Sequence, residues 1–126
     1  MRLFWICLGG AAGTGARYLL SGWTLNKFGP AFPFGTLAVN VLGSFLLAVL
    51  MYVGVEADLM SPPLRLALTT GVLGGFTTYS TFSYETMRYL QEGVWGLAIL
   101  NVFISVFGCL AACVLGWAGA RLLMGS

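Results

Sequence analysis

The sequence contains no histidine and very few charged residues. Among 126 residues there are six Lys or Arg and four Asp or Glu, which together make up 8% of the chain. Without histidine, the Ser/His and Cys/His pairs of nucleophilic enzymes are excluded, and no pair of carboxylates suits shared acid and base roles. No glycine-rich phosphate loop follows a strand pattern. We therefore do not expect an enzyme, and the net charge of +2 is too small to indicate nucleic-acid binding.

Cysteine is also scarce, and its three copies are Cys7, Cys109 and Cys113. Their spacing contains no CxxC pair, and the chain offers no histidine as a second kind of metal ligand. We interpret them as small apolar residues of a membrane protein and not as a metal or redox site.

Hydrophobic residues are abundant instead. They make up 59% of the chain, and the mean hydropathy of +0.91 lies outside the range of soluble domains. The composition predicts an all-α membrane protein formed by one domain over residues 1–126. Segments long enough to cross a bilayer predict four transmembrane helices, at about 3–23, 34–53, 64–90 and 94–115, the last with room to continue to 123.

The third predicted span contains an unusually polar stretch, GVLGGFTTYSTFSYE at 71–85. Gly74 and Gly75 are followed by several hydroxyl residues, and both residue types weaken a helix. We therefore predict that the third helix is broken near Gly74 to Thr78. Broken helices at membrane depth occur where protein or a wet cavity satisfies the freed backbone, and they often hold ions. The simpler alternative is a kinked helix whose hydroxyls bond to their own turns.

Two other spans carry isolated polar side chains. Asn40 is the strongly polar residue of the second span, so its amide needs partners inside the protein. It serves either an interhelical hydrogen bond or a pore, where an amide donor can bind an anion without trapping it. Arg17 in the first span is expected to face a wet vestibule, and the alternative is that it extends to the lipid headgroups. Gly9 and Gly13 form a GxxxG pair suited to close helix packing.

The fourth predicted span combines a polar and a packing face. Asn101, Ser105 and Cys109 recur every four residues, which places them in one polar track on a helix. A neighbouring seam of small residues suited to packing comprises Gly108, Ala112, Gly116 and Ala120.

Aromatic and hydroxyl residues of the polar stretch could serve an anion. Tyr79 and Phe82 share a face if this segment is helical, and the positive edges of aromatic rings can meet an anion. Hydroxyls come from Thr81, Ser83 and Ser105. Taken together, these uncharged donors at membrane depth indicate a small ion channel.

Glu85, near the end of the polar stretch, allows two interpretations. Arg88 lies three residues further on, so the two could form an ion pair on the helix surface. Alternatively, Glu85 has a role in conduction.

The basic residues are nearly balanced between the two predicted membrane faces. Arg2, Arg65 and Arg121 fall on one face, and Lys27 and Arg88 on the other. Because an excess of basic residues sets membrane orientation, a balanced chain can insert both ways, which makes an antiparallel homodimer plausible. Four helices also enclose little space, so we expect a pathway to need a second subunit.

Three motifs resemble the Fluc (CrcB) family of fluoride channels: GTGARY around Arg17, GTLAVNVLGSF around Asn40, and GGFTTYSTFSYE from Gly74 to Glu85. The resemblance covers all four predicted spans. It implies passive export of fluoride from the bacterial cytoplasm, which relieves fluoride toxicity. It also implies an antiparallel, dual-topology homodimer with two pores and a central structural sodium ion, set in the lipid of the bacterial inner membrane as a multi-pass protein.

The same resemblance assigns roles to residues. The sodium ligands would be the backbone carbonyls of Gly74 and Thr77 from each subunit, a donor type that suits a hard cation. Asn40 would be the pore amide, and Tyr79 and Phe82 the aromatic residues that face the ion. The remaining positions of the ion pathway would be Ser83, Asn101 and Ser105 in the polar track, with Thr81 and Glu85 nearby.

Two residues depart from the family pattern. Tyr79 stands where Phe is common, which adds a hydroxyl to a ring-edge contact, and Asn101 stands where some members carry Tyr.

Two other functions are alternatives to a fluoride channel. A small multidrug or cation exporter of dual topology would need a carboxylate within the membrane to exchange protons, and a non-transporting assembly subunit would conduct nothing. For a fluoride channel, we expect chloride to be excluded because it is larger and more weakly bound by short neutral donors.

Overall fold

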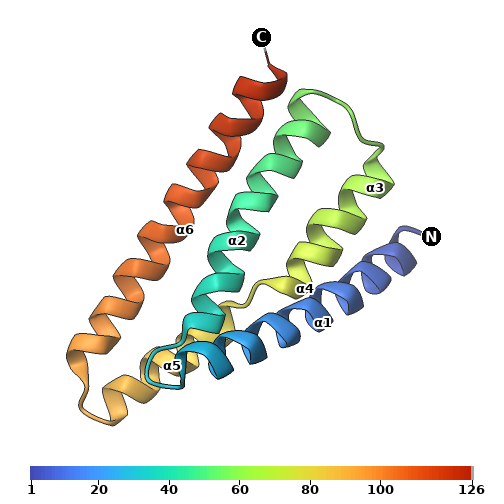
Figure 1. Ribbon diagram of the computed structural model, residues 1–126. Coiled ribbons are helices and arrows are strands. Elements are labelled where there is room, and N and C mark those ends of the chain that lie inside the picture. The colour runs from blue at the N-terminus through green and yellow to red at the C-terminus, as the bar shows by residue number, and fades with distance from the viewer. Residues whose placement is uncertain (126) are drawn as a thin grey trace.

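The computed structural model describes residues 1–125, which form helices and no strand (Figure 1). The elements, in chain order, are α1 (Arg2–Phe28), α2 (Phe34–Met51), the π-helical segment η1 (Tyr52–Glu56), α3 (Pro62–Leu66), the π-helical segment η2 (Ala67–Leu73), α4 (Gly74–Phe76), α5 (Tyr79–Gln91) and α6 (Trp95–Met124). The predicted all-α fold is confirmed. Of the two lengths considered for the last helix, the structure has the longer one.

The helices are arranged around α2 (Figure 1). The long α6 packs along α2, and α1 crosses obliquely to pack against η2 and α4. The series α3, η2 and α4 runs between α1 and α2, and α5 continues from it at one end of the bundle. The end of α4, where this series is interrupted before α5, therefore lies beside both α1 and α2.

Among the described residues, two helices are long and apolar enough to cross a membrane, Phe34–Glu56 and Trp95–Met124. The first and third predicted spans are also largely helical. However, the glycines and Arg17 of α1 make it less apolar, and the third predicted span is interrupted. The length and composition of these two helices agree with the membrane protein that the overall composition predicts.

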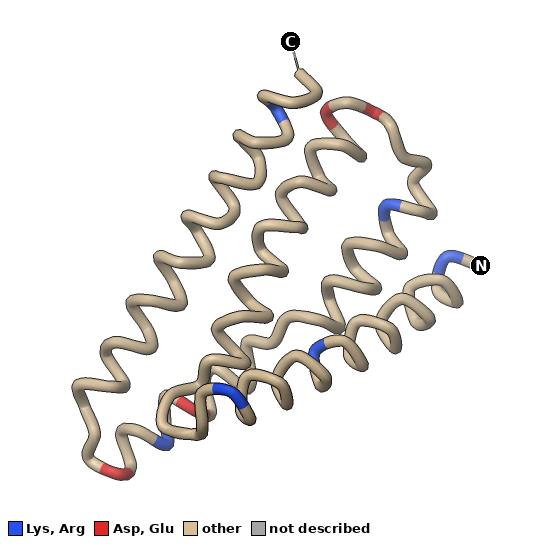
Figure 2. The backbone as a smooth tube through the Cα atoms, in the orientation of Figure 1, with Lys and Arg blue, Asp and Glu red and all other residues tan. Residues whose placement is uncertain are grey.

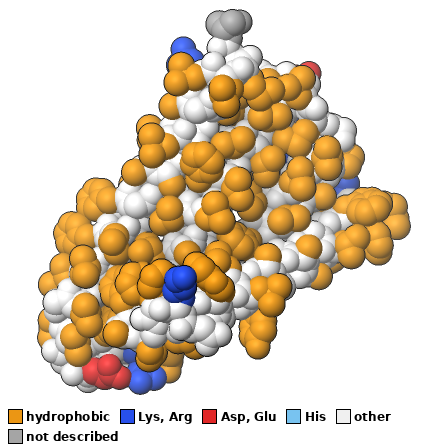
Figure 3. Space-filling view, viewed as in Figure 1, with side chains coloured by type: hydrophobic (Ala, Val, Ile, Leu, Met, Phe, Trp, Pro, Cys, Tyr) orange, Lys and Arg blue, Asp and Glu red, His pale blue; other side chains and the backbone are white. Residues whose placement is uncertain are grey.

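Large apolar side chains cover the outside of the molecule. The buried core is small and consists of Val39, Leu73 and Phe76, where α2, η2 and α4 meet. Outward-facing examples are Leu19 on α1 and Phe107 on α6, which are 72% and 60% exposed. Hydrophobic atoms spread over the whole visible face in Figure 3, with charged groups confined to a few places. Such a surface is suited to lipid and to other membrane helices.

Glycines allow α1 to approach η2 and α4 at backbone distance. A Cβ added to Gly9 would lie 2.5 Å from the carbonyl oxygen of Ala67. A Cβ on Gly13 would overlap the carbonyl of Val72, and one on Gly75 would overlap that of Gly10. The predicted packing role of the GxxxG pair is therefore confirmed.

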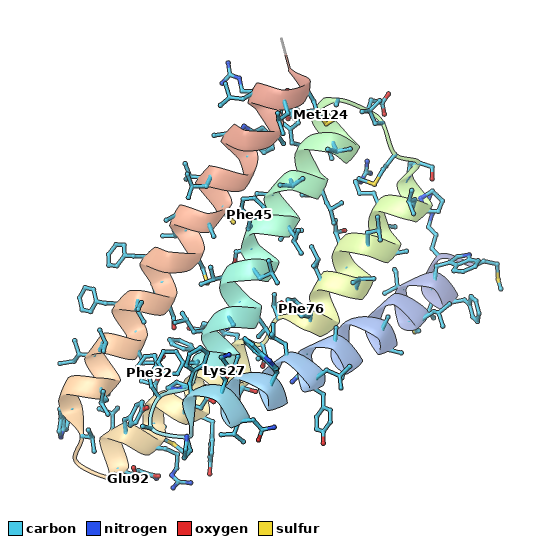
Figure 4. The ribbon with its side chains drawn as sticks, in the orientation of Figure 1. Lys27, Phe32, Phe45, Phe76, Glu92 and Met124 are labelled. Atoms are coloured by element: carbon cyan, nitrogen blue, oxygen red, sulfur yellow. The ribbon has the colours of Figure 1, made fainter. Side chains whose placement is uncertain are left out.

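The small-residue seam of α6 packs against α2, as predicted. Ala112 and Ala120 are buried, and a Cβ on Gly116 would lie 2.5 Å from the carbonyl oxygen of Phe45. Figure 4 labels Phe45 on the stretch of α2 that runs alongside α6.

The predicted break of the third helix is present, and the structure places it at two threonines. Thr77 has φ −88° and ψ 160°, and Thr78 has φ −152° and ψ 119°, so both are extended. The simpler expectation of a continuous, kinked helix is therefore wrong. The two adjacent glycines do not form the break, because Gly74 and Gly75 remain helical in α4. Gly75 is needed for the close approach to α1 instead.

Candidate functional site

Asn40 holds the extended backbone of the break. Its Nδ2 donates to the carbonyl oxygen of Thr78 at 2.9 Å, and the N–H of Thr78 donates to its Oδ1 at 2.8 Å. The side-chain amide of α2 thus pairs with a peptide group as a neighbouring strand would. Asn40 makes the interhelical hydrogen bond that we considered. The amide nitrogen of Asn40 carries two N–H groups, and the bond to Thr78 uses one of them. The other N–H is the one that would bind an anion, so the pore role of Asn40 stays a prediction.

The break frees the backbone carbonyls at the end of α4 from helical bonds, among them those of Gly74 and Thr77. In a continuous helix, the N–H of Thr78 would bond to the oxygen of Gly74, but here it bonds to Asn40. Likewise, the N–H of Thr81, which a helix would direct to the oxygen of Thr77, donates to the Thr78 hydroxyl at 3.2 Å. Thr78 is therefore the N-cap of α5. The oxygens of Gly74 and Thr77 lose their helical partners.

Of the residues with freed carbonyls, Gly74 and Thr77 line one cavity of about 360 Å³, which we call the break cavity. It lies among α2, η2, α4, the first turn of α5, and α6. Several residues predicted from the sequence meet there: Asn40, Gly74, Thr77, Tyr79, Phe82 and Ser105. Carbonyl and hydroxyl oxygens are ligands that suit a hard cation such as sodium. Among residues 1–125, no cluster of His, Cys, Asp and Glu could hold a metal, so a cation would depend on such oxygens.

Tyr79 and Phe82 share a face, as predicted. Their ring centroids lie 5.6 Å apart and their planes meet at 47°. Phe82 is 8% exposed, whereas Tyr79 is 79% exposed, although both line the break cavity. In a single chain, the tyrosine ring therefore points away from the bundle.

The predicted polar track of α6 is present, but only part of it reaches the break cavity. The buried Asn101 donates to the hydroxyl of Thr86 at 3.0 Å and accepts from Ser105 at 3.4 Å. Ser105 and Cys109 line the break cavity, whereas Asn101 faces α5. We did not predict Thr86 as its partner. Its spacing of four residues from Phe82 places Thr86 on the same face of α5, but this spacing does not identify its partner on α6.

A second cavity, which we call the polar cavity, has a volume of about 750 Å³ and lies between α1, α2 and α5. Arg17 lines it and donates from Nε to the carbonyl oxygen of Gly75 at 3.1 Å, beside a weaker bond from Thr14 at 3.5 Å. Arg17 therefore points towards the helix break and does not extend away to the surface. Its guanidinium thereby satisfies one of the carbonyls at the end of α4, that of Gly75.

Glu85 also lines the polar cavity and is joined to α2. Its Oε2 accepts a hydrogen bond from the hydroxyl of Thr36 at 3.0 Å. Its Oε1 is buried and has no hydrogen-bond partner among the described residues. The ion pair that we considered with Arg88 is absent, because Arg88 pairs with Glu92 at 2.9 Å on the next turn. Thr36 was not among the predicted site residues.

The hydroxyls at the start of α5 lie in different places. Thr78 lines the break cavity and Thr81 lines the polar cavity, and their hydroxyls are joined by a 3.0 Å hydrogen bond. These two threonines thus connect the two cavities. Ser83 bonds back to the carbonyl of Tyr79 at 3.0 Å and is exposed outside both cavities. In a single chain Ser83 thus lies apart from Asn101 and Ser105, and its predicted place in the polar track stays a prediction.

Known proteins resemble this chain over most of its length. The sequence model of the family described as CrcB-like protein, Camphor Resistance (CrcB) matches residues 4–117. The protein named fluoride-specific ion channel FluC of Sorangium cellulosum is 54% identical over 123 residues, which cover 98% of this chain and 97% of that protein. Proteins of the same name from Anaeromyxobacter dehalogenans and Citrifermentans bemidjiense are 54% and 48% identical, over 88% and 97% of this chain and 88% and 98% of their own.

Proposed function

The chain belongs to the CrcB-like family, and we propose that it conducts fluoride passively through the bacterial inner membrane as an antiparallel pair of subunits. That it is a fluoride channel of a membrane and not an enzyme rests on one observation, the match to fluoride-specific channels over nearly the whole chain. The exporter and the assembly subunit weighed from the sequence are set aside for the same reason.

The chemistry of the two cavities supports this function. Fluoride is small and strongly hydrated, so a pathway must replace its water with short hydrogen bonds. Thr78 and Thr81 offer hydroxyls where the two cavities meet. Neutral donors bind an anion without the tight attraction of a fixed opposite charge. Chloride is larger and gains less from such donors, so it is excluded.

We propose that the two cavities form successive parts of the ion pathway. Asn40, Tyr79, Phe82 and Ser105 belong to the inner part, which is the break cavity. The outer part is the polar cavity, lined by Arg17, Thr81 and Glu85. Asn101 supports the pathway through Ser105 and Thr86 and does not line it.

Four membrane crossings and an antiparallel partner complete the proposal. The crossings are α1, α2 with η1, the series from α3 to α5, and α6. The balanced basic residues support insertion in both directions. A second subunit would cover the break cavity, and the exposed Tyr79 would then contribute to a pathway shared by both copies.

A structural sodium ion fits the break. The support is the pair of carbonyl oxygens, from Gly74 and Thr77, that lose their helical partners because Asn40 and the Thr78 hydroxyl take the N–H groups. Bound sodium would supply a fixed positive charge that compensates these dipoles. Arg17, through the neighbouring carbonyl of Gly75, keeps α1 attached to the same segment.

Fluoride efflux from liposomes that contain the purified protein tests the function, with a fluoride electrode and a parallel chloride measurement. We expect fast fluoride efflux and no chloride efflux. The variant Asn40→Asp should abolish the flux, because it replaces a donor by a charge that repels the anion. Asn26→Asp, which makes the same change at an exposed position near the end of α1, should conduct like the wild type. Equal fluoride and chloride flux would contradict selectivity.

A further inference from the structure

The polar cavity ends at an ion pair on the last turn of α5, which we call the charged rim and which consists of Arg88 and Glu92. Both residues line the cavity. Their side chains are each 52% exposed, and Nη2 of Arg88 lies 2.9 Å from Oε2 of Glu92. Figure 4 places Glu92 at the far end of α5, where the chain turns into α6. Figure 2 shows an acidic position at this turn of the chain and a basic position shortly before it. The rim is therefore in contact with both solvent and the cavity.

The other two charges of the cavity are engaged deeper inside. Arg17 donates to the carbonyl of Gly75, and Glu85 accepts from Thr36. Two of the charged lining residues are basic and two are acidic, so their formal charges sum to zero. The field that an approaching anion meets first is consequently set by the rim, because its two charges are the exposed ones.

We propose that the charged rim sets the rate at which fluoride enters the polar cavity, with Arg88 attracting the anion and Glu92 opposing this attraction. This inference rests on the proposed function. Clefts that carry one sign of charge raise the local concentration of the opposite ion and its rate of entry. In this chain, Glu92 limits that effect by pairing with Arg88. The rim therefore acts on the approach of the ion and not on its passage past Asn40 or Phe82.

The size of the effect follows from Coulomb's law. Two unit charges about 10 Å apart in water interact with roughly the thermal energy, which changes a local ion concentration about twofold. Salt screens this interaction, since the Debye length falls from about 30 Å at 0.01 M to about 3 Å at 1 M ionic strength. Exposed ion pairs between neighbouring turns of a helix contribute little to stability. An effect that disappears in salt is therefore distinguishable from a structural one.

The test measures fluoride efflux from liposomes at about 10 mM and about 500 mM ionic strength, set with sodium glutamate inside and outside. At low ionic strength, Glu92→Gln should conduct about twofold faster than the wild type and Arg88→Gln about twofold slower. The double variant should return close to the wild type. All four proteins should conduct alike at high ionic strength. Glu56→Gln makes the same charge change in η1, away from both cavities, and should follow the wild type throughout.

Two results would overturn the proposal. One is equal flux of Glu92→Gln, Arg88→Gln and wild type at low ionic strength, and the other is a difference that persists unchanged at high ionic strength. If one single variant does not fold, the other tests the proposal in the opposite direction. Failure of the proposed function is separate, because the wild type would then conduct no fluoride at either ionic strength.

Discussion

Asn40 and Thr78 are joined by two reciprocal hydrogen bonds, 2.9 Å and 2.8 Å long, between a side-chain amide of α2 and the backbone of the helix break. The bond to Oδ1 satisfies the Thr78 N–H, which the break would otherwise leave unpaired inside the protein. The bond from Nδ2 is a second one to the N-cap carbonyl, which also accepts the first helical bond of α5. Helix α2 therefore determines where the third segment is interrupted. The same side chain lines the break cavity, so the residue that fixes the break also contacts the proposed pathway.

Removal of this amide should destabilise the protein. Asn40→Ala loses both hydrogen bonds and leaves the N–H of Thr78 unpaired, so we expect a loss of about 1–3 kcal/mol. The melting temperature of the purified protein in detergent measures this loss. Asn26→Ala, at an exposed position, is the matched control and should change stability little. An unchanged melting temperature of Asn40→Ala would contradict the anchoring role.

Alanine should destabilise the protein far more when it replaces a glycine of α1 that packs against η2 than when it replaces a glycine of α1 with open space around it. Gly13→Ala places a Cβ against the carbonyl of Val72, so α1 must move away from η2. We expect a loss of at least about 2 kcal/mol, as for other overpacked sites. Gly15→Ala and Gly22→Ala meet nothing within 4 Å and should be neutral or stabilising by up to about 1 kcal/mol, because alanine favours a helix. Thermal unfolding in one detergent compares all three. Equal effects at these positions would refute the close packing of α1.

The bond between Thr36 and Glu85 makes a prediction that separates stability from conduction. Thr36→Val removes the donor and leaves both carboxylate oxygens of Glu85 without a partner, which should cost about 1–3 kcal/mol. Glu85→Gln keeps an oxygen for the Thr36 hydroxyl and should change stability by less than about 1 kcal/mol. Its fluoride flux should nevertheless differ from that of the wild type, because the charge of the polar cavity changes. Normal flux through a stable Glu85→Gln protein would remove Glu85 from the conduction pathway.

Removal of sodium should weaken both stability and flux. If the oxygens of Gly74 and Thr77 hold this ion, replacing sodium in all solutions by the large cation N-methyl-D-glucamine should lower the melting temperature and the fluoride flux together. Restored sodium should recover both. Lithium and potassium serve as controls for cation size, since carbonyl sites discriminate by the fit of the ion. Stability and flux that do not depend on the cation would contradict the sodium site.

The sequence predicted those features that depend on residues close together in the chain. The hydroxyl-rich stretch predicted the break, and the three-residue spacing predicted the common face of Tyr79 and Phe82. Partners on other helices were not predictable in this way. Thr36 bonds to Glu85, and Thr86 bonds to Asn101, because of how α2 and α6 are rotated against α5. No property of a single segment fixes such a rotation.

The exact position of the break also depended on packing. Two adjacent glycines are the weakest helix formers of the segment, yet they remain helical because Gly75 packs against Gly10 of α1. The extended residues are instead the threonines, where Asn40 offers a replacement for the lost helical bonds. The low helix propensity of the segment thus identified the region of the break, and contacts with α1 and α2 determined which of its residues are extended.

The π-helical geometry of η2 has a consequence for the permitted length of the chain. A π-helix has more residues per turn than an α-helix, since each N–H bonds five residues back. If one residue between Ala67 and Leu73 were deleted, the segment could return to an α-helix, and the residues on either side would keep nearly the same faces, because a π-helical turn holds more residues than an α-helical turn. The deletion must spare Gly71, which faces the backbone of Ile6 in α1. In a continuous α-helix such as α2, a deletion would instead turn the flanking residues by about 100°, so a single deletion should be tolerated more readily in η2 than in α2.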